Sequence, residues 1–316
     1  MSDLKSNVPK IANNFNTSMD NAKKQFLNML NNRSTWGTVF LTLVIIFLIW
    51  IISWYINNKL RLKNQNNRNM SYNLDYYDRT IGSIKQKDLS MTLRDYYIMS
   101  SYNSCCGGNT LKDFVDKTPL KKVIDKGTRF LDFEIYSIDG KPIIAAGKES
   151  NTNGKYCIKG TYNHLDFDEV IDEINRNAFN GNGCPNPSDP LFLNFRIKTN
   201  KTAIYKQMYN KLNKEFREKL LPLEYLDDGH LSKQNNITNI PLAKLRNKVI
   251  ICVDDKNKNY VGSDLEKIIS ISNKGADGRG MPFVAYYKDR EIIQTYDTDS
   301  LKERNTSQIA ISMPDF

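Results

Sequence analysis

The stretch GTRFLDFEIYSIDGKPIIAAG, residues 127–147, decides the fold because it holds two strand-like runs in succession. RFLDFEIYS (129–137) and KPIIAAG (141–147) have the length of strands and are rich in β-branched and aromatic residues. Similar runs recur along the second half of the chain. They are DYYIMSS (95–101), LFLNFRI (191–197), KVIICVDD (248–255), FVAYY (283–287) and QIAISM (308–313).

Helical patterns separate several of these runs. Asp166, with Glu169 three residues on, has the spacing of a helix N-cap and opens DFDEVIDEINRNAF. A second helix fits residues 203–221. Strands that alternate with helices predict an α/β domain with a largely parallel sheet.

The run WGTVFLTLVIIFLIWIISWYI, from Trp36 to Ile56, carries no charge over 21 residues. A helix of that length matches a hydrocarbon core of about 30 Å. A core helix rarely stays apolar on every face for this long, and the 35 residues before the run are too many for the start of a signal peptide. We therefore predict a retained transmembrane helix, which makes the chain a single-pass membrane protein.

Basic residues flank the run on both sides, which gives only a slight preference for a cytosolic C-terminal domain. They would also favour anionic lipid, although ordinary stop-transfer flanking explains them as well. These residues are Lys23, Lys24, Arg33, Lys59, Arg61, Lys63 and Arg68.

Composition narrows the class of protein. The 316 residues hold 45 Lys and Arg against 35 Asp and Glu, and the five cysteines are too few and odd in number for a disulfide-stapled miniprotein. Much of the net charge of +10 is local to the N-terminal region, and the chain has no Arg-rich stripe or zinc motif, so we expect no nucleic-acid partner.

The chain divides into four predicted parts. Residues 1–35 form a polar tail in which an amphipathic helix from Ser18 is an open alternative, and residues 36–56 form the transmembrane helix. Residues 57–88 are a polar linker, and residues 89–316 form the α/β domain.

The order of the motifs resembles the X-region of the phosphatidylinositol-specific phospholipase C superfamily. The resemblance covers roughly residues 89–255 and rests on SSYN (100–103), residues 127–147, FDEVIDEINRNAF (167–179), DPLFLNFRI (189–197) and LRNKVIICVDD (245–255). It implies a TIM-barrel-like domain with its site at the carboxyl ends of the strands. The local sequences SYNSCCGG, CPNPSDPLFLNFRI and SMPD look most like degenerate members encoded by large DNA viruses.

The resemblance also implies which residues to inspect for acid–base chemistry. The family cleaves a phosphodiester with two histidines, one in an S-H-N motif and one before a glycine. The matching positions here are Tyr102 and Ala146, so both imidazoles are absent. Each member of such a pair typically contributes about 10²–10⁴ in rate, so we expect no active catalytic residue and lost phosphoric diester hydrolysis.

The family's calcium position is altered too. Eukaryotic members hold Ca²⁺ with an Asn and three acids, and Asn103, Asp132 and Glu134 match three of these. The last two are two residues apart, which places both side chains on one face of a strand. Arg196 stands at the position of the missing acid and would repel the ion. We predict that its guanidinium lies between Asp132 and Glu134 and replaces the metal, so that calcium could bind only if Arg196 were displaced.

Other groups offer weak alternatives. His164 and His230 are the only histidines, and neither matches a catalytic position of the family. A different chemistry with Tyr102 as base and Arg196 as electrostatic clamp is conceivable. The cysteines show no metal-binding spacing, and we expect them to be reduced thiols.

About seven strand candidates follow residue 88, whereas the barrel needs eight. Two explanations stay open. A strand is hidden in residues 256–275, or the barrel is incomplete toward its C-terminal end and has an open edge that a partner chain could cover.

Three functions fit these observations. The first is a membrane-anchored, catalytically degenerate domain that binds an inositol or phosphate head group, such as a phosphoinositide, or a protein partner. The second is an active phosphodiesterase with rearranged groups. The third is a structural component of a host-cell or virion membrane. An open cationic pocket would favour ligand binding, and a pocket plugged by Tyr102 and Arg196 would favour the scaffold.

Overall fold

The computed structural model consists of an N-terminal unit, residues 1–62, and a larger unit, residues 63–316. It describes residues 18–25, 27–28, 35–76, 80–108, 112–147, 158, 160–222, 237–254, 258–273, 284–288, 297–306 and 309–313. His230 and Cys157 lie outside the described residues.

The apolar run forms part of helix α2 (Thr35–Tyr76). From Gly37 onward this helix is long and apolar enough to cross a bilayer, with a mean hydropathy of 2.7 in its most apolar window, and that window is not buried by protein. The helix does not stop at Ile56 but continues for five and a half turns through residues for which we expected a linker.

Contacts within the larger unit explain why the end of α2 stays helical. Lys63 forms an ion pair of 2.6 Å with Asp116, and Asn66 donates a 2.8 Å hydrogen bond to Asp113. Met70 packs against the main core. No proline or glycine occurs between residues 57 and 76 to end the helix.

The barrel-like sheet is built around strand β2 (Phe130–Ile138), which pairs in parallel with β5 (Leu191–Ile197) and at its start with β1 (Ser100–Ser101). Beyond β5 the parallel sheet continues through β6 (Val249–Asp254) to β7 (Ile269–Asn273). On the other side, β3 (Lys141–Ala145) is antiparallel to β2 and carries the short β4 (Leu165–Asp166).

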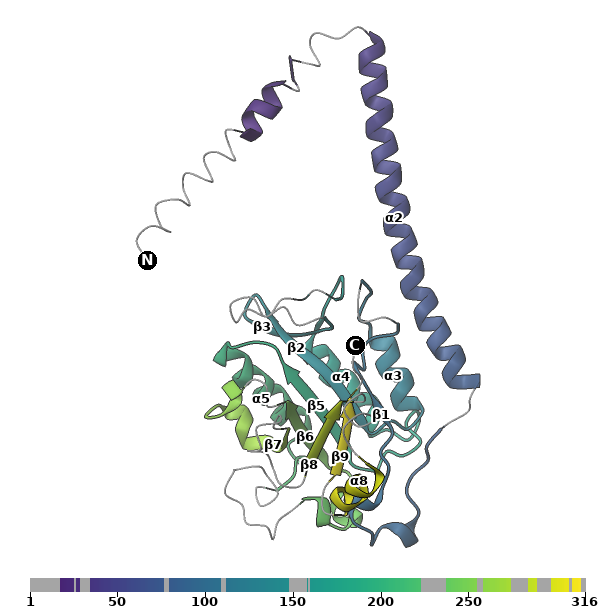
Figure 1. Ribbon diagram of the computed structural model, residues 1–316, viewed down its shortest axis with the longest axis vertical. Coiled ribbons are helices and arrows are strands. Elements are labelled where there is room, and N and C mark those ends of the chain that lie inside the picture. Colours follow the sequence, from purple (N-terminus) through teal and green to yellow (C-terminus); the bar gives the residue numbers. More distant parts are fainter. Residues whose placement is uncertain are drawn as a thin grey trace. The chain divides into compact units, whose positions relative to one another are not determined.

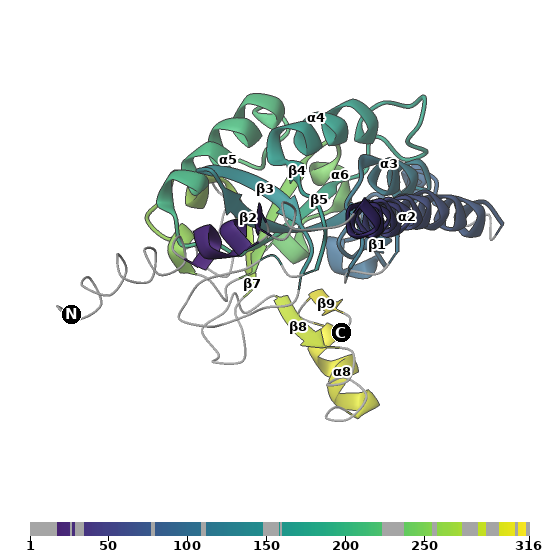
Figure 2. The ribbon, with the colours of Figure 1, turned by 90° about the horizontal axis from the view of Figure 1, so that it is seen from above.

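Helices cover the outer face of this sheet (Figures 1 and 2). They are α3 (Lys117–Asp125), α4 (Phe167–Ala178) and α5 (Thr202–Phe216), with the short α6 (Leu242–Leu245) before β6. Single-turn 3-10 helices occupy Gln86–Asp88, Leu93–Asp95, Ile237–Asn239, Lys258–Tyr260 and Asp264–Ile268.

Strand β8 (Val284–Lys288), helix α8 (Thr298–Asn305) and strand β9 (Ile309–Met313) complete the chain. β8 and β9 pair in parallel as a separate two-stranded sheet, on the side of the main sheet away from α4 and α5 (Figure 2). Among the described residues, no ladder joins this small sheet to β7 or to β1.

Side chains alternate between two cores along the strands. Leu131, Phe133 and Ile135 of β2 face the helices and join the larger core. Phe130 points the other way, into a second core that it shares with Phe192 on β5 and Ile271 on β7. This alternation places Asp132 and Glu134, which share the parity of Phe130, on the inner face.

Several predicted elements lie at shifted positions. Within the run 95–101, only Ser100 and Ser101 form a strand. Pairing with β2 begins at the carbonyl of Met99, which accepts hydrogen bonds from the backbone N–H groups of Arg129 and Phe130. The helix predicted for 203–221 ends at Phe216, and Leu220 bridges to Val249 instead. Asp166 does occupy the N-cap of α4, but its side chain makes no capping hydrogen bond.

Two strands were missing from our count: the two-residue β4, and β7, which lies in the region 256–275 that we considered for a hidden strand. The isoleucines of β7 join the two cores, Ile269 on the helix side and Ile271 on the inner side. A bulge between Ile251 and Cys252 shifts its register against β6.

The fold makes one direct prediction about its core. Phe195 is fully buried; its ring stacks on Phe133 with 6.1 Å between centroids and lies tilted against Phe167 at 5.6 Å. Phe195→Ala should lower the free energy of unfolding by about 3–5 kcal/mol, because it leaves a cavity between sheet and helices.

Amide hydrogen exchange of β5 measures this loss. Tryptophan fluorescence would not monitor the barrel, because the three tryptophans (36, 50 and 54) all lie in α2. The control Val261→Ala, at an exposed position, should change the free energy by less than about 0.5 kcal/mol. Equal effects of the two substitutions would contradict the assigned core.

Candidate functional site

The site lies on the inner face of the sheet, beside the first half of β2 and toward the carboxyl end of β5. Parallel pairing aligns Asp132 with Asn194 and Glu134 with Arg196, so the four side chains form two adjacent cross-strand pairs. All four are buried. The sequence predicted three of them and missed Asn194, although its position two residues before Arg196 could have placed it on the same face.

Arg196 is the centre of this cluster, and all five of its N–H donors are used. Nε donates to Asp132 at 3.0 Å, and the two Nη2 hydrogens go to Asp132 at 2.8 Å and to Asn103 at 2.6 Å. Nη1 donates to Glu134 at 2.6 Å and to the hydroxyl of Tyr102 at 3.1 Å. Arg196 therefore lies between the two acids, as the sequence analysis predicted, with ion-pair distances of 2.8 Å to Asp132 and 2.6 Å to Glu134.

The carboxylates are equally well supplied with donors. Asp132 also accepts from the side chain of Asn194 at 2.7 Å and from the backbone N–H of Asn103 at 3.1 Å. The second oxygen of Glu134 accepts from the Tyr136 hydroxyl at 2.8 Å and from the backbone N–H of Gly147 at 3.0 Å. Each of the four carboxylate oxygens thus has at least one donor, which is the condition for keeping such charges in a core.

The loop after β1 closes the cluster. Asn103 has φ of 44°, a left-handed conformation that asparagine tolerates better than most residues. Ser104 fixes the loop to β2, because its N–H donates to the carbonyl of Asp132 and its Oγ accepts from the N–H of Asp132. The ring of Tyr102 lies over the guanidinium, with 4.5 Å between its centroid and Cζ of Arg196.

Burial and the neighbouring charges keep both the Arg196 guanidinium and the Tyr102 hydroxyl protonated. Burial alone would lower the pKa of Arg196, but the carboxylates of Asp132 and Glu134 more than offset it and raise that pKa. Burial raises the pKa of Tyr102, with Arg196 acting in the opposite direction. The Tyr102 hydroxyl is therefore protonated at neutral pH and is a poor base.

Calcium does not fit this arrangement. The oxygens that would hold it, from Asn103, Asp132 and Glu134, all accept hydrogen bonds from the Arg196 guanidinium. A divalent cation at the same place would meet a fixed positive charge and find those ligands engaged. The described residues contain no other group of three acidic, His or Cys side chains that could hold a metal ion.

The remaining predicted positions add no acid–base group. Ala146 follows β3, is fully buried, and donates its backbone N–H to Thr161. His164 is exposed beside the start of α4. Cys105 and Cys106 are free thiols, and burial, followed by nearby acidic charge, raises the pKa of Cys106 to about 12, so it is not a reactive thiolate.

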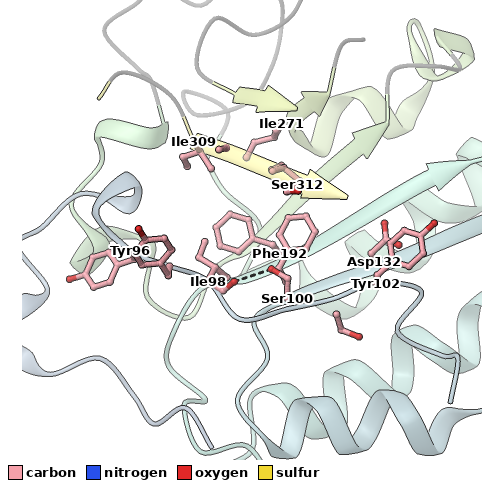
Figure 3. A pocket seen from close by; sticks show the side chains of 14 residues that line it. Tyr96, Ile98, Ser100, Tyr102, Asp132, Phe192, Ile271, Ile309 and Ser312 are labelled. Atoms are coloured by element: carbon pink, nitrogen blue, oxygen red, sulfur yellow. Dashed lines mark hydrogen bonds between the residues drawn. The ribbon is translucent and has the colours of Figure 1, made fainter. Parts of the chain in front are cut away.

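A pocket of about 220 Å³ begins beneath Tyr102 and Asp132 and extends along the inner face toward the amino ends of β2 and β5 (Figure 3). We call it the seam pocket, because it lies between β1 and β9, where the described strands are not paired. Its lining residues are Tyr96, Tyr97, Ile98, Ser100, Ser101, Tyr102, Phe130, Asp132, Phe192, Ile271, Ile309, Ala310, Ile311 and Ser312.

Comparison with known proteins identifies the domain. Residues 89–255, just over half of the chain, match the family described as phosphatidylinositol-specific phospholipase C, X domain. A comparison with curated proteins found no match.

Solved structures agree on the fold. The chain resembles PLC21 of L. pealei and of S. officinalis, with TM-scores of 0.54 and identities of 18% and 20%. Each match covers 72% of this chain but only 31% of the other, so the chain spans about a third of the length of these proteins. At this identity the likeness establishes the mixed α/β, TIM-barrel-like fold of phospholipases C.

The cluster predicts that replacing its arginine lowers the free energy of unfolding far more than replacing a surface arginine. Arg196→Met should lower the free energy of unfolding by about 3–5 kcal/mol at pH 7.5, because it leaves two buried carboxylates without a counter-charge.

Urea unfolding monitored by hydrogen exchange measures this loss. The control Arg176→Met removes an exposed ion pair with Glu173 on α4 and should cost less than about 0.5 kcal/mol. Equal losses of stability for the two variants would contradict the buried-charge account.

A second prediction concerns the metal. The wild-type protein should show no change in unfolding temperature on addition of Ca²⁺. Arg196→Glu supplies a third acid and should gain a calcium-dependent stabilisation, about 2.7 kcal/mol at a free Ca²⁺ concentration 100 times the dissociation constant.

The matched variant Arg196→Gln removes the same positive charge without adding an acid and should not gain that stabilisation. Differential scanning calorimetry with Ca²⁺ and with chelator compares the three proteins. A wild-type protein stabilised as strongly as Arg196→Glu would refute the replacement of metal by arginine.

Proposed function

Because the chain belongs to the phosphatidylinositol-specific phospholipase C X-domain family, we propose that it is a membrane-anchored member that no longer cleaves phosphodiesters. It serves as a scaffold or partner-binding module at a membrane. One observation carries the proposal: the Arg196 guanidinium occupies the centre of the site and uses all five of its donors within the protein.

The loss of catalysis follows from what the reaction needs. Cleavage by internal attack of an inositol hydroxyl requires a group that takes a proton and a group that gives one. The two positions hold the protonated hydroxyl of Tyr102, which is engaged with Arg196, and the methyl group of Ala146. With about 10²–10⁴ in rate lost for each group, turnover would fall by at least about four orders of magnitude.

The alternative, an active phosphodiesterase with Tyr102 as base, fits these groups less well. The raised pKa of Tyr102 leaves very little phenolate at neutral pH. To bind a phosphate, Arg196 would have to break its buried ion pairs with Asp132 and Glu134. That would leave two buried carboxylates without a counter-charge, which costs free energy.

The anchor supports a location at a membrane. The apolar part of α2 has the length of a single span, and the basic residues after it give the slight preference for a cytosolic domain described above. A host-cell membrane or the internal membrane of a virion would each suit such a module.

The filled cluster favours a structural or protein-binding role over recognition of a phosphoinositide head group. The buried donors of Arg196, which would otherwise attract a phosphate, are already satisfied by protein groups. A head group could therefore bind only through residues outside this cluster.

Full-length protein reconstituted in vesicles that contain phosphatidylinositol tests the proposal. We expect no release of inositol phosphate above the rate of empty vesicles, with Ca²⁺ or with chelator. Turnover that is abolished by Arg196→Met or by Tyr102→Phe, and unaffected by the surface control Arg176→Met, would overturn it.

The same preparation separates the binding roles. Soluble inositol phosphate added at millimolar concentration should not raise the unfolding temperature. A saturable increase would instead assign a head-group-binding function to the domain.

A further inference from the structure

The seam pocket differs chemically from the charged cluster above it. Phe130 and Phe192 form its floor, with their ring centroids 6.0 Å apart, and both belong to the inner core. Ile271 and the β9 residues Ile309 and Ile311 form the facing wall (Figure 3). The pocket is therefore continuous with the second core and is lined by residues of that core.

Polar groups of three lining residues, Ser100, Tyr96 and Asp132, are already engaged in hydrogen bonds. Ser100 donates its hydroxyl to the carbonyl of Ile98 at 2.9 Å, and Tyr96 donates its hydroxyl to the carbonyl of Asp88. The oxygens of Asp132 accept from Asn103, Asn194 and Arg196. The lining residues that the structure describes include no Lys, Arg or His, so this part of the pocket offers an anionic head group no cation.

These features point to a neutral, apolar and slender ligand. A volume of about 220 Å³ is below the range of about 300–1,000 Å³ typical of sites for compact drug-sized molecules. An added peptide strand fits less well, because β1 contributes only Ser100 and Ser101 as an edge. An aliphatic chain needs no hydrogen-bond partner and gains from leaving water.

We propose that the seam pocket binds one acyl chain of a membrane lipid between β1 and β9. The inference rests on the proposed function in one respect, since the membrane anchor keeps the domain at a bilayer that supplies such chains. The bound chain would extend the second core across the unpaired seam, contacting Phe130, Phe192 and Ile311.

Photolabelling of the full-length protein tests this. The chain is reconstituted in phosphatidylcholine nanodiscs that include a phosphatidylcholine with a diazirine near the end of one acyl chain. After irradiation, mass spectrometry should find label in α2 and also in peptides that contain Phe130, Phe192 or Ile309.

A variant that fills the pocket provides the critical comparison. Ser100 pairs with Phe130 across the ladder and shares its face, so Ser100→Trp places a large ring in the pocket. It should reduce label in the pocket peptides at least fivefold and leave label in α2 unchanged. The control Val261→Trp, at an exposed position that does not line the pocket, should change neither.

Ile311→Trp, on the facing strand, replaces Ser100→Trp if the latter does not fold, because Ile311 lines the pocket and packs against the inner core, and it should give the same loss of label. Label in α2 without label in the pocket would overturn this inference and leave the anchored scaffold intact. No label in α2 would overturn both.

Two further results would also overturn the acyl-chain site. One is pocket label that both filling variants leave unchanged. The other is a concentration-dependent dimer that protects the unlabelled pocket peptides, which would assign the seam to a strand from a second copy.

Discussion

The site depends on one constraint: two carboxylates buried on the inner face of a barrel need a positive charge of matching geometry. Asp132 and Glu134 are held there by the alternation of β2, and the parallel register brings Arg196 of β5 beside them. A planar fork of five donors can serve both acids and two loop groups at once. The conformation of the Tyr102–Ser104 loop and the position of Gly147 then follow from the hydrogen bonds they make to this cluster.

An internal guanidinium differs from a metal ion in a way that matters for function. A metal can keep open coordination positions for a substrate, whereas Arg196 has no donor left to offer. A buried ion pair also adds little net stability compared with apolar residues of similar volume. Its contribution here is geometric, because it fixes the position of the Tyr102–Ser104 loop over the site. A site whose donors are all engaged within the protein fits the proposed scaffold better than an enzyme, and the seam pocket between β1 and β9 is a more apolar opening beside it.

Local sequence patterns were sufficient to predict the positions of the central strands. β2, β5 and β6 lie within one residue of the predicted runs, because apolar content and strand length decide them. Distant contacts decided what the sequence could not predict. The end of α2 is helical because Lys63, Asn66 and Met70 meet partners far along the chain. β7 has few residues of clear strand character, and its place depends on pairing with β6.

The same distinction applies to the site. The contact of Arg196 with both acids could be predicted, since opposite charges at matched positions of neighbouring strands must meet. The roles of Asn194, Tyr136 and the Gly147 N–H could not, because a polar residue shows no partner until the register is known. The seam pocket lies between β1 and β9, which are not paired in the described part of the chain, and such a gap depends on several distant segments at once.

The most direct measurement of the central claim is a crystal structure of the protein grown with millimolar Ca²⁺. The account predicts the Arg196 guanidinium within about 3 Å of Asp132 and Glu134 and no calcium at the site. Calcium bound by Asn103, Asp132 and Glu134, with Arg196 turned out of the barrel, would contradict it.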